Sequence, residues 1–351
     1  MKGEVMVDTR FFPGAHKYWH NGKLYDWDSH IVHVMAHVVH YGSSVFEGIR
    51  AYDTDAGPAI FRLQDHLKRF EHSAHTLNMK MPYSIEEITD AIKLVMKENR
   101  LRNAYVRPNL FYAYGNLGLV PKASPVELTV GCWDWGAYLG EEGLENGVHV
   151  LMLPWRRIHH TQIDMHAKLG GMYVQSNIGA TFARQHGFDE GVFLNLEGRI
   201  AEGPGENIII VKNGALYTND VTESILPGIT RTTILELAKD LGMETHIQPI
   251  TVEAFLDADE VFFTGTAAEV TPITRVTDAR DRNQRPEEWK TYTIGTGKPG
   301  PITRQLAARY ADVVRGKIPE YREKWLTFVY KDAEEARQYL KDVDVERVTK
   351  F

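Results

Sequence analysis

Alternating apolar and polar residues in the first third of the chain predict strands interleaved with amphipathic helices, an α+β unit. Residues 18–25 place Asn21-Gly22 between two apolar runs, which is a strong β-hairpin signal. A helix is expected from Asp65, because apolar residues recur at helical spacing at Leu67, Phe70, Ala74 and Leu77. A second helix is expected from Ser84, where Glu87 completes a capping box. Strands are expected at 46–52, 104–112 and 126–133.

A second α+β unit is predicted from Val148 onward. Asn213-Gly214 indicates a hairpin within 207–218, and Gly242 marks the C-terminal cap of a helix over 230–241. Further elements are expected as strands at 191–196, 199–202 and 261–263 and as a helix at 300–314.

A shift in composition predicts where the two units divide. Residues 134–143 are glycine-rich and turn-like, so we expect a boundary near Tyr138. The predicted domains are a small N-terminal one, 1–138, and a large C-terminal one, 139–351. The polar segment 278–293 indicates a surface insertion, and the charged segment 331–351 indicates a tail helix, exposed or at an interface.

Composition and charge narrow the class of protein. The 351 residues are 43% hydrophobic and 25% charged, which is ordinary globular usage and excludes collagen, coiled coil and wholesale disorder. The formal net charge of −7 argues against a sequence-wide electrostatic grip on nucleic acid. The composition alone suits an enzyme and a scaffold equally well, so the site must decide the function.

Two further features predict the compartment. The single cysteine, Cys132, cannot form an internal disulfide, which favours a reducing compartment. Residues 1–14 mix charged residues with Val and Phe and contain no continuous apolar run, so no signal peptide is expected. No run of about 18 apolar residues predicts a membrane span. We therefore expect a cytoplasmic protein.

Two turns in the second half have the residue types of anion sites. Residues 226–231, Leu-Pro-Gly-Ile-Thr-Arg, precede a predicted helix, whose first N–H groups and dipole favour an anion. Thr230 is expected to cap this helix and to donate its hydroxyl. Residues 264–269, which contain Gly-Thr-Ala-Ala, are expected as a second strand-to-helix turn of the same kind. The alternative is that both are ordinary helix starts.

Two other motifs contain potentially reactive side chains. Glu202 and Glu206 lie in a Gly-Pro-Gly turn beside a very apolar strand, where a carboxylate must be paired or its pKa rises. Lys168 precedes Gly170-Gly171, which would let a ligand ring approach the backbone closely, and lysine is the residue that forms Schiff bases. The alternatives are a solvated hairpin turn and a surface lysine.

In combination and in this order, the motifs resemble one family. Ala-Lys-x-Gly-Gly-x-Tyr, Glu-Gly-x-Gly-Glu-Asn, Leu-Pro-Gly-Ile-Thr-Arg and Gly-Thr-Ala-Ala-Glu resemble the class IV, fold-type IV pyridoxal-phosphate aminotransferases, above all the branched-chain-amino-acid aminotransferases. The resemblance covers roughly 17–330 and includes 40–50 and 105–108. It implies an α+β fold like that of D-amino-acid aminotransferase, in which two α/β-containing domains hold the cofactor between them.

The resemblance implies a role for each cofactor residue. Lys168 would form the aldimine with pyridoxal 5′-phosphate and shuttle a proton during ping-pong transamination. Glu202 would pair with the pyridinium nitrogen, which keeps the ring an electron sink, and Tyr173 would hydrogen-bond the ring's phenolic oxygen. Arg69 would bind the phosphate. The remaining cofactor contacts would come from Leu226, Gly228, Ile229, Thr230 and Thr266.

The resemblance also implies a substrate pocket and a partner. Phe46 and the tyrosines would form an apolar wall for a branched side chain, and Arg107 would accept the second carboxylate of glutamate. The full set comprises Tyr41, Phe46, Gly48, Tyr105, Arg107, Tyr138, Ala267 and Ala268. The substrates would be L-leucine, L-isoleucine or L-valine with 2-oxoglutarate. The family is at least homodimeric, because a loop of the small domain completes the partner's site.

Departures from the family pattern concern substrate range. Leu169 follows the lysine where the family usually has Ala, 155–166 lacks the common proline-bearing sequence, and 116–119 replaces a more glycine-rich loop. Within the fold the rival activities are D-amino-acid aminotransferase, (R)-amine transaminase and aminodeoxychorismate lyase. The pocket residues resemble the branched-chain pattern instead.

Two other patterns suggest different chemistry and are weaker. Residues 295–299, Gly-Thr-Gly-Lys-Pro, lack the upstream glycine and the hydroxyl residue of a nucleotide loop. Four histidines three and four apart have a spacing that suits zinc, although they precede the pocket segment and are expected to pack or cap there, so no metal is expected; they are His30, His33, His37 and His40.

Overall fold

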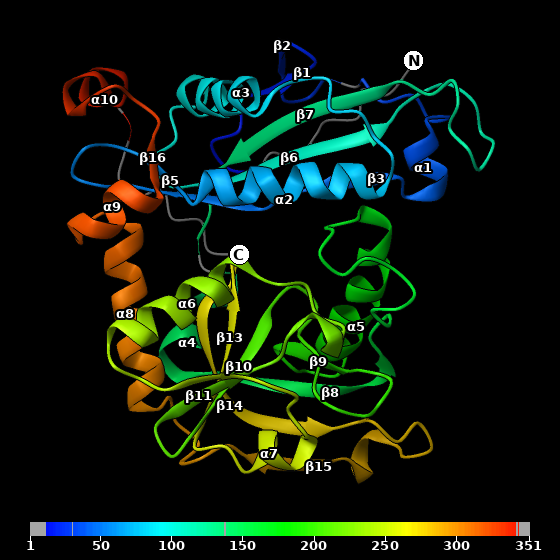
Figure 1. Cartoon of the computed structure of the whole chain (residues 1–351), viewed down its shortest axis with the longest axis vertical. Helices are drawn as coiled ribbons and strands as arrows, with labels where there is room; N and C mark the ends of the chain where they lie inside the picture. The colour runs from blue at the N-terminus through cyan, green and yellow to red at the C-terminus, as the bar shows by residue number, and fades with distance from the viewer. Residues whose placement is uncertain (1–11, 30, 137, 342, 344–351) are drawn as a thin grey trace. The chain divides into compact units, whose positions relative to one another are not determined.

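The computed structural model describes residues 12–29, 31–136, 138–341 and 343 (Figure 1). These residues form two compact units. Unit 1 comprises the described residues of 12–136, 167–171 and 313–343, and unit 2 comprises 138–166 and 172–312. The break after Gly136 lies close to the expected boundary. The division differs from the expected one at 167–171 and from 313 onward, because both segments pack with unit 1.

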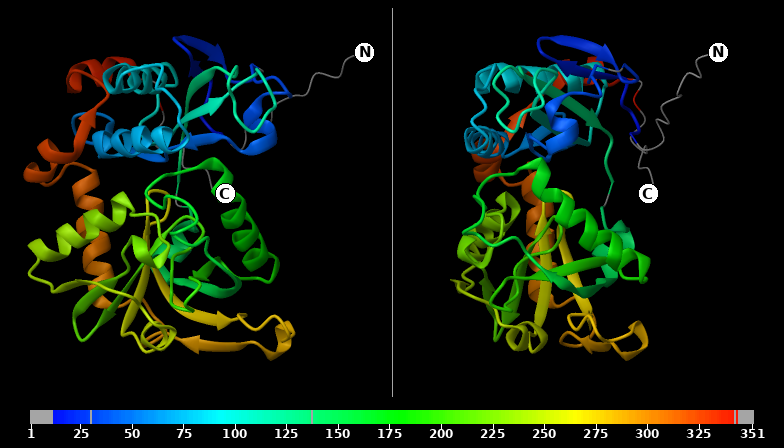
Figure 2. Two further views of the ribbon diagram at one scale, coloured as in Figure 1. Left: turned by 45° about the vertical axis from the view of Figure 1, so that its right-hand side comes forward. Right: turned by 90° about the vertical axis from the view of Figure 1, so that its right-hand side faces the viewer.

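Unit 1 is a sheet of eight strands, counted over the described residues, in the order β16-β5-β4-β6-β7-β1-β2, with β3 also paired to β6. The pairings are antiparallel. Helices α2 and α3 cover one face of this sheet (Figure 2). The elements are β1 (Lys17–His20), β2 (Lys23–Asp26), α1 (His37–Tyr41), β3 (Ser44–Phe46), β4 (Ile49–Tyr52), β5 (Ala59–Phe61), α2 (Leu63–Thr76), α3 (Ile85–Glu98), β6 (Ala104–Tyr112), β7 (Val126–Trp133), α9 (Pro319–Trp325), β16 (Leu326–Phe328) and α10 (Ala333–Tyr339).

Unit 2 is a mixed sheet, in the order β12-β11-β10-β13-β14-β8-β9 with β15 paired to β14 in the described residues. Phe193 of β9 and Ala183 of α5 share one apolar cluster, and Phe255 of α7 lies in a separate one. The elements are α4 (Gly140–Asn146), β8 (Val148–Arg156), η2 (Gly170–Met172, begun in unit 1), α5 (Tyr173–Gln185), β9 (Glu190–Leu194), β10 (Asn207–Lys212), β11 (Ala215–Thr218), η3 (Val221–Glu223), α6 (Ile229–Asp240), β12 (Thr245–Ile247), α7 (Val252–Leu256), β13 (Glu260–Gly265), β14 (Glu269–Asp278), η4 (Pro286–Glu288), β15 (Lys290–Thr293) and α8 (Pro301–Val314, ending in unit 1).

Local sequence signals set several of these elements. The Asn21-Gly22 hairpin is confirmed, since both residues have positive φ and join β1 to β2. The capping box at Ser84 and Glu87 is confirmed at the start of α3. The Asn213-Gly214 hairpin joins β10 to β11, and Gly242 follows α6 with a φ of 74°.

Two predictions of elements were wrong, and two others are met in part. The expected strand 46–52 is broken at Glu47-Gly48, so that β3 and β4 separate. Residues 199–202 form only a single bridge, from Ile200 to Leu194. The expected surface insertion 278–293 is exposed over 281–288, and it ends in β15, which pairs with β14. Within 331–351 only α10 is helical among the described residues, and 342 and 344–351 lie outside them.

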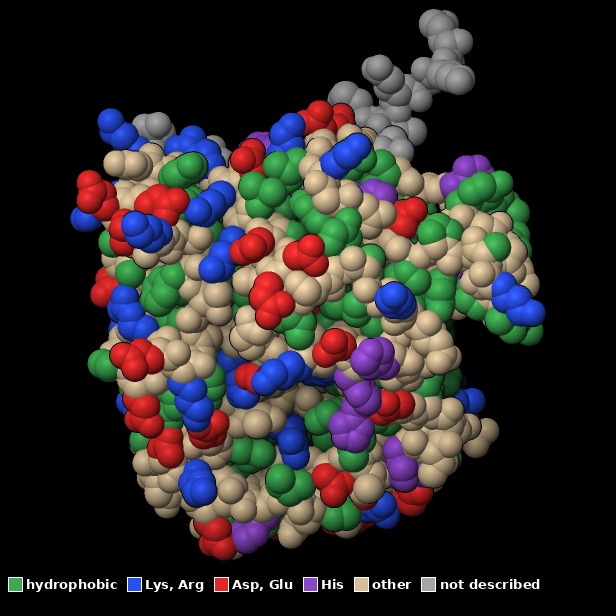
Figure 3. Space-filling view, turned by 45° about the horizontal axis from the view of Figure 1, so that its top comes forward, with side chains coloured by type: hydrophobic (Ala, Val, Ile, Leu, Met, Phe, Trp, Pro, Cys, Tyr) green, Lys and Arg blue, Asp and Glu red, His purple; other side chains and the backbone are tan. Residues whose placement is uncertain are grey.

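No helix among the described residues is long and apolar enough to cross a membrane. Charged side chains of both signs are interspersed over the α10 and α3 side of unit 1 (Figure 3). There Lys97 of α3 pairs with Glu335 of α10 at 3.0 Å.

Candidate active site

The predicted site residues divide between the two units. Unit 1 holds seven of them, Tyr41, Phe46, Gly48, Arg69, Tyr105, Arg107 and Lys168. Unit 2 holds the rest, Tyr138, Tyr173, Glu202, Leu226, Gly228, Ile229, Thr230, Thr266, Ala267 and Ala268.

The backbone of Lys168 is held on both sides within unit 1. Its N–H donates to Ser73 Oγ of α2 at 2.8 Å, and its carbonyl accepts from the N–H of Phe46 at 3.2 Å. Ser73 Oγ also donates to the carbonyl of Arg69, one turn earlier on α2. The Lys168 amine lies 5.0 Å from the centroid of the Phe46 ring. The lysine is therefore fixed against an aromatic ring and is not a loosely tethered surface residue.

The two glycines after Lys168 allow a close approach of the chain to itself. A Cβ on Gly170 would collide with Ser44 Oγ, and a Cβ on Gly42 would lie 3.0 Å from the Cα of Gly171. Within unit 1 the chain's own strand and the turn before it lie against this Gly-Gly pair, and the approach of a ligand ring to it stays a prediction.

Arg69 is engaged by a buried carboxylate that no sequence motif singled out. Glu47 is fully buried and accepts from Arg69 Nε at 2.6 Å and Arg69 NH2 at 2.9 Å. His66 Nδ1 lies 2.8 Å from the same carboxylate. Burial acts to raise the pKa of Glu47, but the charges of Arg69 and His66 outweigh it and hold that pKa well below its usual range. The plane of the Arg69 guanidinium is thus fixed by a bidentate pair.

Four predicted substrate residues come together in unit 1. Arg107 NH2 donates to the Tyr105 hydroxyl at 3.1 Å, and the Arg107 guanidinium lies 4.6 Å from the Phe46 ring centroid. A Cβ on Gly48 would collide with the Tyr105 hydroxyl, so this position requires glycine. Tyr41 lies apart from these four, 46% exposed, and its hydroxyl donates to the carbonyl of Leu117 at 2.8 Å.

A cavity of about 680 Å³ opens beside these residues. Phe46 and Arg107 line it, together with the aromatic residues Phe12, Trp27 and Trp133. Arg107 Nε is buried without a hydrogen-bond partner among the described residues. A cavity lined by aromatic rings and by a guanidinium-bearing residue suits a ligand that has a hydrocarbon part and an acidic group.

Unit 2 provides the predicted partner for a ring nitrogen. Glu202 is 3% exposed, and its Oε1 accepts from Arg157 Nε at 2.9 Å. Its Oε2 accepts from Asn207 Nδ2 at 3.2 Å and from the N–H of Leu226 at 3.0 Å. Asn207 also binds both ends of the next turn, through the carbonyl of Leu226 and the N–H of Gly228. The carboxylate and the turn before α6 therefore form one hydrogen-bonded group.

The predicted phosphate turn opens α6. The helix begins at Ile229 with Gly228 as its N-cap, which forms no side-chain cap hydrogen bond. The prediction that Thr230 caps this helix is wrong, because Thr230 is the second helical residue and is buried. A Cβ on Gly228 would collide with Asn207 Oδ1. The first turn of a helix has N–H groups without intrahelical partners, which suits an anion.

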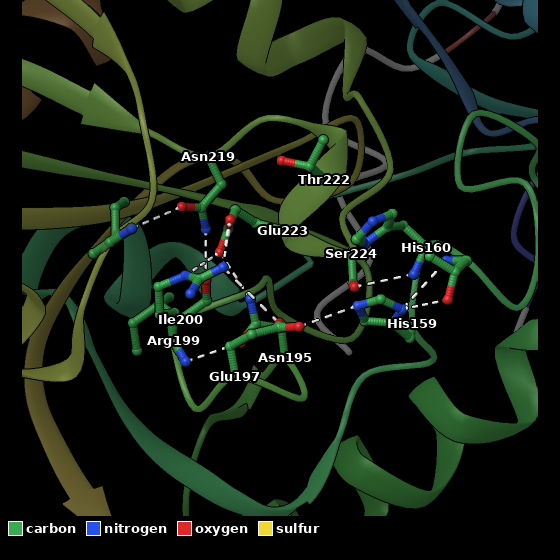
Figure 4. Close-up of polar contacts among 12 residues, drawn as sticks. His159, His160, Asn195, Glu197, Arg199, Ile200, Asn219, Thr222, Glu223 and Ser224 are labelled. Atoms are coloured by element: carbon green, nitrogen blue, oxygen red, sulfur yellow. Dashed lines mark hydrogen bonds and ion pairs between the residues drawn. The ribbon is translucent and has the colours of Figure 1, made fainter.

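A polar network braces the loop that leads to this turn (Figure 4). Glu223 is 3% exposed and forms a bidentate pair with Arg199, with distances of 2.6 and 2.8 Å. Asn195 Nδ2 donates to the same carboxylate at 2.7 Å. Ser224, which has a φ of 64°, accepts from the N–H of His160 at 3.2 Å. The loop before α6 is therefore anchored to two other segments of unit 2.

The second predicted anion turn is a β-hairpin. Residues 265–269 connect β13 to β14, with Gly265 paired to Glu269, so the prediction of a strand-to-helix turn was wrong. The β-branched residues after Glu269 favour a strand, and Glu269 itself has a positive φ of 53°. Thr266, Ala267 and Ala268 form the tip of this hairpin. Tyr173 is placed as the first residue of α5.

The residues present fit a phosphorylated, protonated heterocycle. A helix start whose cap residue is glycine suits a phosphate dianion, and the ion-paired carboxylate of Glu202 suits a cationic ring nitrogen. Unit 1 by itself offers the Lys168 amine and the Arg69 guanidinium, which is fixed in plane. These residue types suit pyridoxal phosphate, and their joint role in binding it stays a prediction.

The residues that hold these groups were not predicted from the sequence. Glu47 lies in the segment 40–50 that carries the resemblance but was given no role, His66 and Ser73 gave no motif signal, and the partners of all three become apparent only in the fold. Asn207 was visible as the last residue of Glu-Gly-x-Gly-Glu-Asn, and Arg157 as part of an unusual segment, but neither was given a role.

Two of the four spaced histidines form ordinary hydrogen bonds within the part of the chain that the structure describes. His37 contacts Ser43 Oγ at 2.7 Å and the carbonyl of Gly118 at 3.1 Å, and His40 contacts the carbonyl of Val34 at 3.1 Å. His30 lies outside the described residues. Within them, no group of three or more His, Cys, Asp or Glu side chains is arranged to hold a metal ion.

Comparisons with known proteins all find aminotransferases, and the similarity extends over most of the chain. The profile of the family described as amino-transferase class IV matches residues 44–276. A branched-chain-amino-acid aminotransferase of Pseudomonas aeruginosa is 45% identical over 312 residues, which cover 89% of this chain and 96% of that protein. The crystal structure of the Escherichia coli branched-chain amino acid aminotransferase has a TM-score of 0.83 at 38% identity, covering 90% of this chain and 100% of that one. The branched-chain amino acid aminotransferase from Thermobaculum terrenum, in its PLP-bound holo form, has a TM-score of 0.80 at 32% identity, covering 90% of this chain and 99% of that one.

Proposed function

The chain belongs to the amino-transferase class IV family, and from this premise we propose that it transfers the amino group of L-leucine, L-isoleucine or L-valine to 2-oxoglutarate. Class IV aminotransferases depend on pyridoxal 5′-phosphate, which is the cofactor of this protein. The products are the branched-chain 2-oxo acid and L-glutamate, formed in two half-reactions at one site.

One observation carries the proposal. The Lys168 amine, the Phe46 ring and the Arg107 guanidinium form one cluster beside an aromatic cavity. An apolar wall accepts an aliphatic side chain, and Arg107 accepts the second carboxylate of glutamate. These two ligand types are the amino acid that is consumed in the first half-reaction and the amino acid that is formed in the second.

Pyridoxal phosphate, when bound, supplies the carbon that receives the amino group and a ring that stabilises negative charge at the reacting carbon. We propose that Lys168 binds it covalently and moves the proton at the substrate Cα. Glu202 holds a proton on the ring nitrogen, and Arg69 with the first turn of α6 binds the phosphate. Tyr173 donates to the phenolic oxygen, while Leu226 and Thr266 contact the ring and phosphate side.

The substrate residues orient the donor. We propose that Tyr105 and Arg107, with the N–H groups of Ala267 and Ala268, bind carboxylates. Phe46, Gly48, Tyr41 and Tyr138 shape the space for the side chain. Such positioning places the Cα–H bond within reach of the Lys168 amine.

The visible absorbance of the purified protein tests the function. Titration with L-leucine in the absence of an oxo acid should bleach the band of the bound cofactor, and 2-oxoglutarate should restore it. D-alanine and an (R)-amine serve as matched controls. Bleaching by either of these and not by L-leucine would move the activity to a D-amino-acid aminotransferase or an (R)-amine transaminase of the same fold.

We also propose that the protein acts as a homodimer or a higher oligomer of dimers. Apolar side chains gather on the projection formed by α1 and the loop after β6 (Figure 3). Leu119 is 83% exposed, Val120 61% and Val34 71%. Exposed apolar patches of this kind are typical of protein interfaces, and in a symmetric dimer the same patch of each copy contributes to the interface. No part of this proposal involves nucleic acid or membrane.

Sedimentation analysis tests the oligomer. A Leu119→Glu/Val120→Glu variant should sediment as a monomer at a protein concentration at which the parent is a dimer, because charges would be buried at the interface. Lys122→Glu changes charge in the same loop without removing apolar surface, and it should leave the dimer intact. A monomeric parent, or a dimeric double variant, contradicts this interface.

We also propose that the protein is located in a reducing, cytoplasmic compartment. The sole cysteine, Cys132, is buried, and burial raises the pKa of its thiol to about 12, so it is protected from oxidation. A single cysteine leaves the chain without an internal disulfide, which supports the hypothesis of a reducing, cytoplasmic environment.

A further inference from the structure

Glu206 is a buried acid to which the proposed function gives no role. It is 4% exposed and lies four residues after Glu202 in the same turn. Its Oε2 accepts from the N–H of Gly205 at 3.0 Å. A Cβ on Gly203 would lie 2.6 Å from this oxygen, and a Cβ on Gly265 would lie 3.4 Å from Glu206 Cγ. The side chain is therefore enclosed by two glycine turns, one of which leads directly to Thr266.

A second buried acid, Glu190, shares these surroundings. Glu190 opens β9 and is fully buried. Its Oε1 accepts from the N–H of Gly191 at 3.0 Å, and its Oε2 accepts from the Tyr138 hydroxyl at 3.3 Å. Arg184 NH2 lies 3.9 Å from the same oxygen, and the Arg184 side chain is 52% exposed.

The charges around this pair do not balance. Among the described residues no Lys, Arg or His nitrogen lies within 4.0 Å of the Glu206 carboxyl group, and Arg184 alone pairs with Glu190. Two buried carboxylates thus share one half-exposed guanidinium, which does not stabilise two negative charges. One of the two acids must hold a proton.

The surroundings favour Glu206 as the protonated member. Burial, and after it the charges of Glu190 and Glu202, raise the pKa of Glu206 to about 8. The hydrogen bond from the N–H of Gly205 and the charge of Arg184 act to lower this pKa but do not outweigh those effects. Burial also raises the pKa of Glu190, with Asp189 adding to it. Glu190 has the donors that stabilise its charge, namely a backbone N–H, a phenol and the guanidinium.

Tyr138 provides the link to the substrate pocket. Burial and then the charges of Glu206 and Glu190 raise the pKa of its hydroxyl well above the usual value, so Tyr138 remains a phenol and donates. The Arg184 guanidinium lies 5.6 Å from the centroid of its ring. The Tyr138 hydroxyl is therefore held by its acceptor Glu190, and a charge on Glu206 acts on this hydroxyl through space.

We propose that Glu206 is a positioning residue that holds a proton in the resting protein and leaves Glu190 ionised, so that the Tyr138 hydroxyl is directed to Glu190 and its ring is fixed as a wall of the pocket. Loss of the Glu206 proton to solvent places a second negative charge beside Glu190 and Tyr138, and disturbs that wall. This inference rests on the proposed function only in treating Tyr138 as a pocket residue.

Infrared difference spectroscopy of the holoenzyme tests the proton without relying on activity. The wild type at pH 7 should show the carbonyl stretch of a protonated carboxyl group, which decreases as the pH is raised through about 8. Glu206→Gln should lack this stretch at all pH values. Glu287→Gln, a substitution of an exposed glutamate of unit 2, should retain it. A wild-type spectrum at pH 7 identical to that of Glu206→Gln overturns the inference.

The pH dependence of the KM for L-leucine tests the positioning role. If only the protonated form binds well, KM should rise about tenfold in the wild type one pH unit above the pKa, since about a tenth of the protein remains competent. In Glu206→Gln, whose amide is neutral throughout, KM should be flat over the same range, while kcat is affected less than KM in both proteins. A rise in KM of equal size in Glu206→Gln contradicts the inference. Absence of transamination in every variant, with the infrared band intact, would instead overturn the proposed function.

Discussion

Replacement of Lys168 by alanine should abolish both the visible absorbance of bound pyridoxal phosphate and the transfer of the amino group. The amine is the proposed covalent anchor and the proposed proton carrier, so a fall in kcat of at least about 10³-fold is expected. The backbone conformation at this position should be unchanged in the variant, because Ser73 Oγ and the N–H of Phe46 hold the backbone of Lys168.

Absorbance spectra and single-turnover assays of the Lys168→Ala protein measure this result. Lys80→Ala, which changes an exposed lysine of unit 1, is the matched control and should keep the spectrum of the parent. A coloured and active Lys168→Ala protein would show that another residue anchors the cofactor.

Replacement of Glu47 by leucine should cost about 3–5 kcal/mol of unfolding free energy, since it leaves Arg69 and the buried His66 without their shared partner. The pKa of Glu47 is depressed in the folded protein. Its contribution to stability is therefore complete above the unfolded value of about 4.3 and is lost as the pH falls through the folded value. At pH 7 the full effect should be observed. The affinity for pyridoxal phosphate should fall as well, because Arg69 loses the pair that fixes its plane.

Urea unfolding of the cofactor-free protein at pH 7 measures the change in stability, and fluorescence titration measures cofactor affinity. Glu98→Leu replaces an exposed glutamate of α3 and should change the unfolding free energy by no more than about 0.5 kcal/mol. Equal stability of Glu47→Leu and Glu98→Leu would mean that the Glu47–Arg69 pair contributes nothing to the fold.

The parts of the structure that depend on neighbouring residues were predictable from sequence. The Asn21-Gly22 hairpin and the Ser84 capping box follow from backbone conformations and hydrogen bonds that span three or four residues. Periodicity placed β6 and β7 at the bounds that the structure shows. The break between β3 and β4 was missed although Gly48, a residue type that weakens strands, marks it. The reason that glycine is needed there is not local, because a Cβ would collide with the Tyr105 hydroxyl.

The candidate site divides in the same way. The family's motifs identified Lys168, Arg69 and Glu202, whose roles in the reaction remain predictions. The residues that hold them, such as Ser73 and Arg157, are separated from their partners by up to about a hundred positions, and no periodicity links them. Buried polar pairs depend on tertiary contacts. The hairpin at 265–269 was predicted as a helix start because Gly-Thr-Ala-Ala is equally compatible with both, and the pairing of β13 with β14 decides between them.

The pairing of β16 with β5 determines the order in which a newly made chain can complete its fold. Strand β16, at 326–328, closes an edge of a sheet whose other strands all come from the first 133 residues. β5 ends at Phe61 and β16 begins at Leu326, so during synthesis the edge of β5 stays unpaired until the intervening residues, most of them in unit 2, have left the ribosome. A messenger RNA truncated shortly before this strand would yield a chain that has every proposed catalytic residue but leaves the edge of β5 unpaired. Such an exposed edge can pair with another chain, so the truncated protein is expected to aggregate.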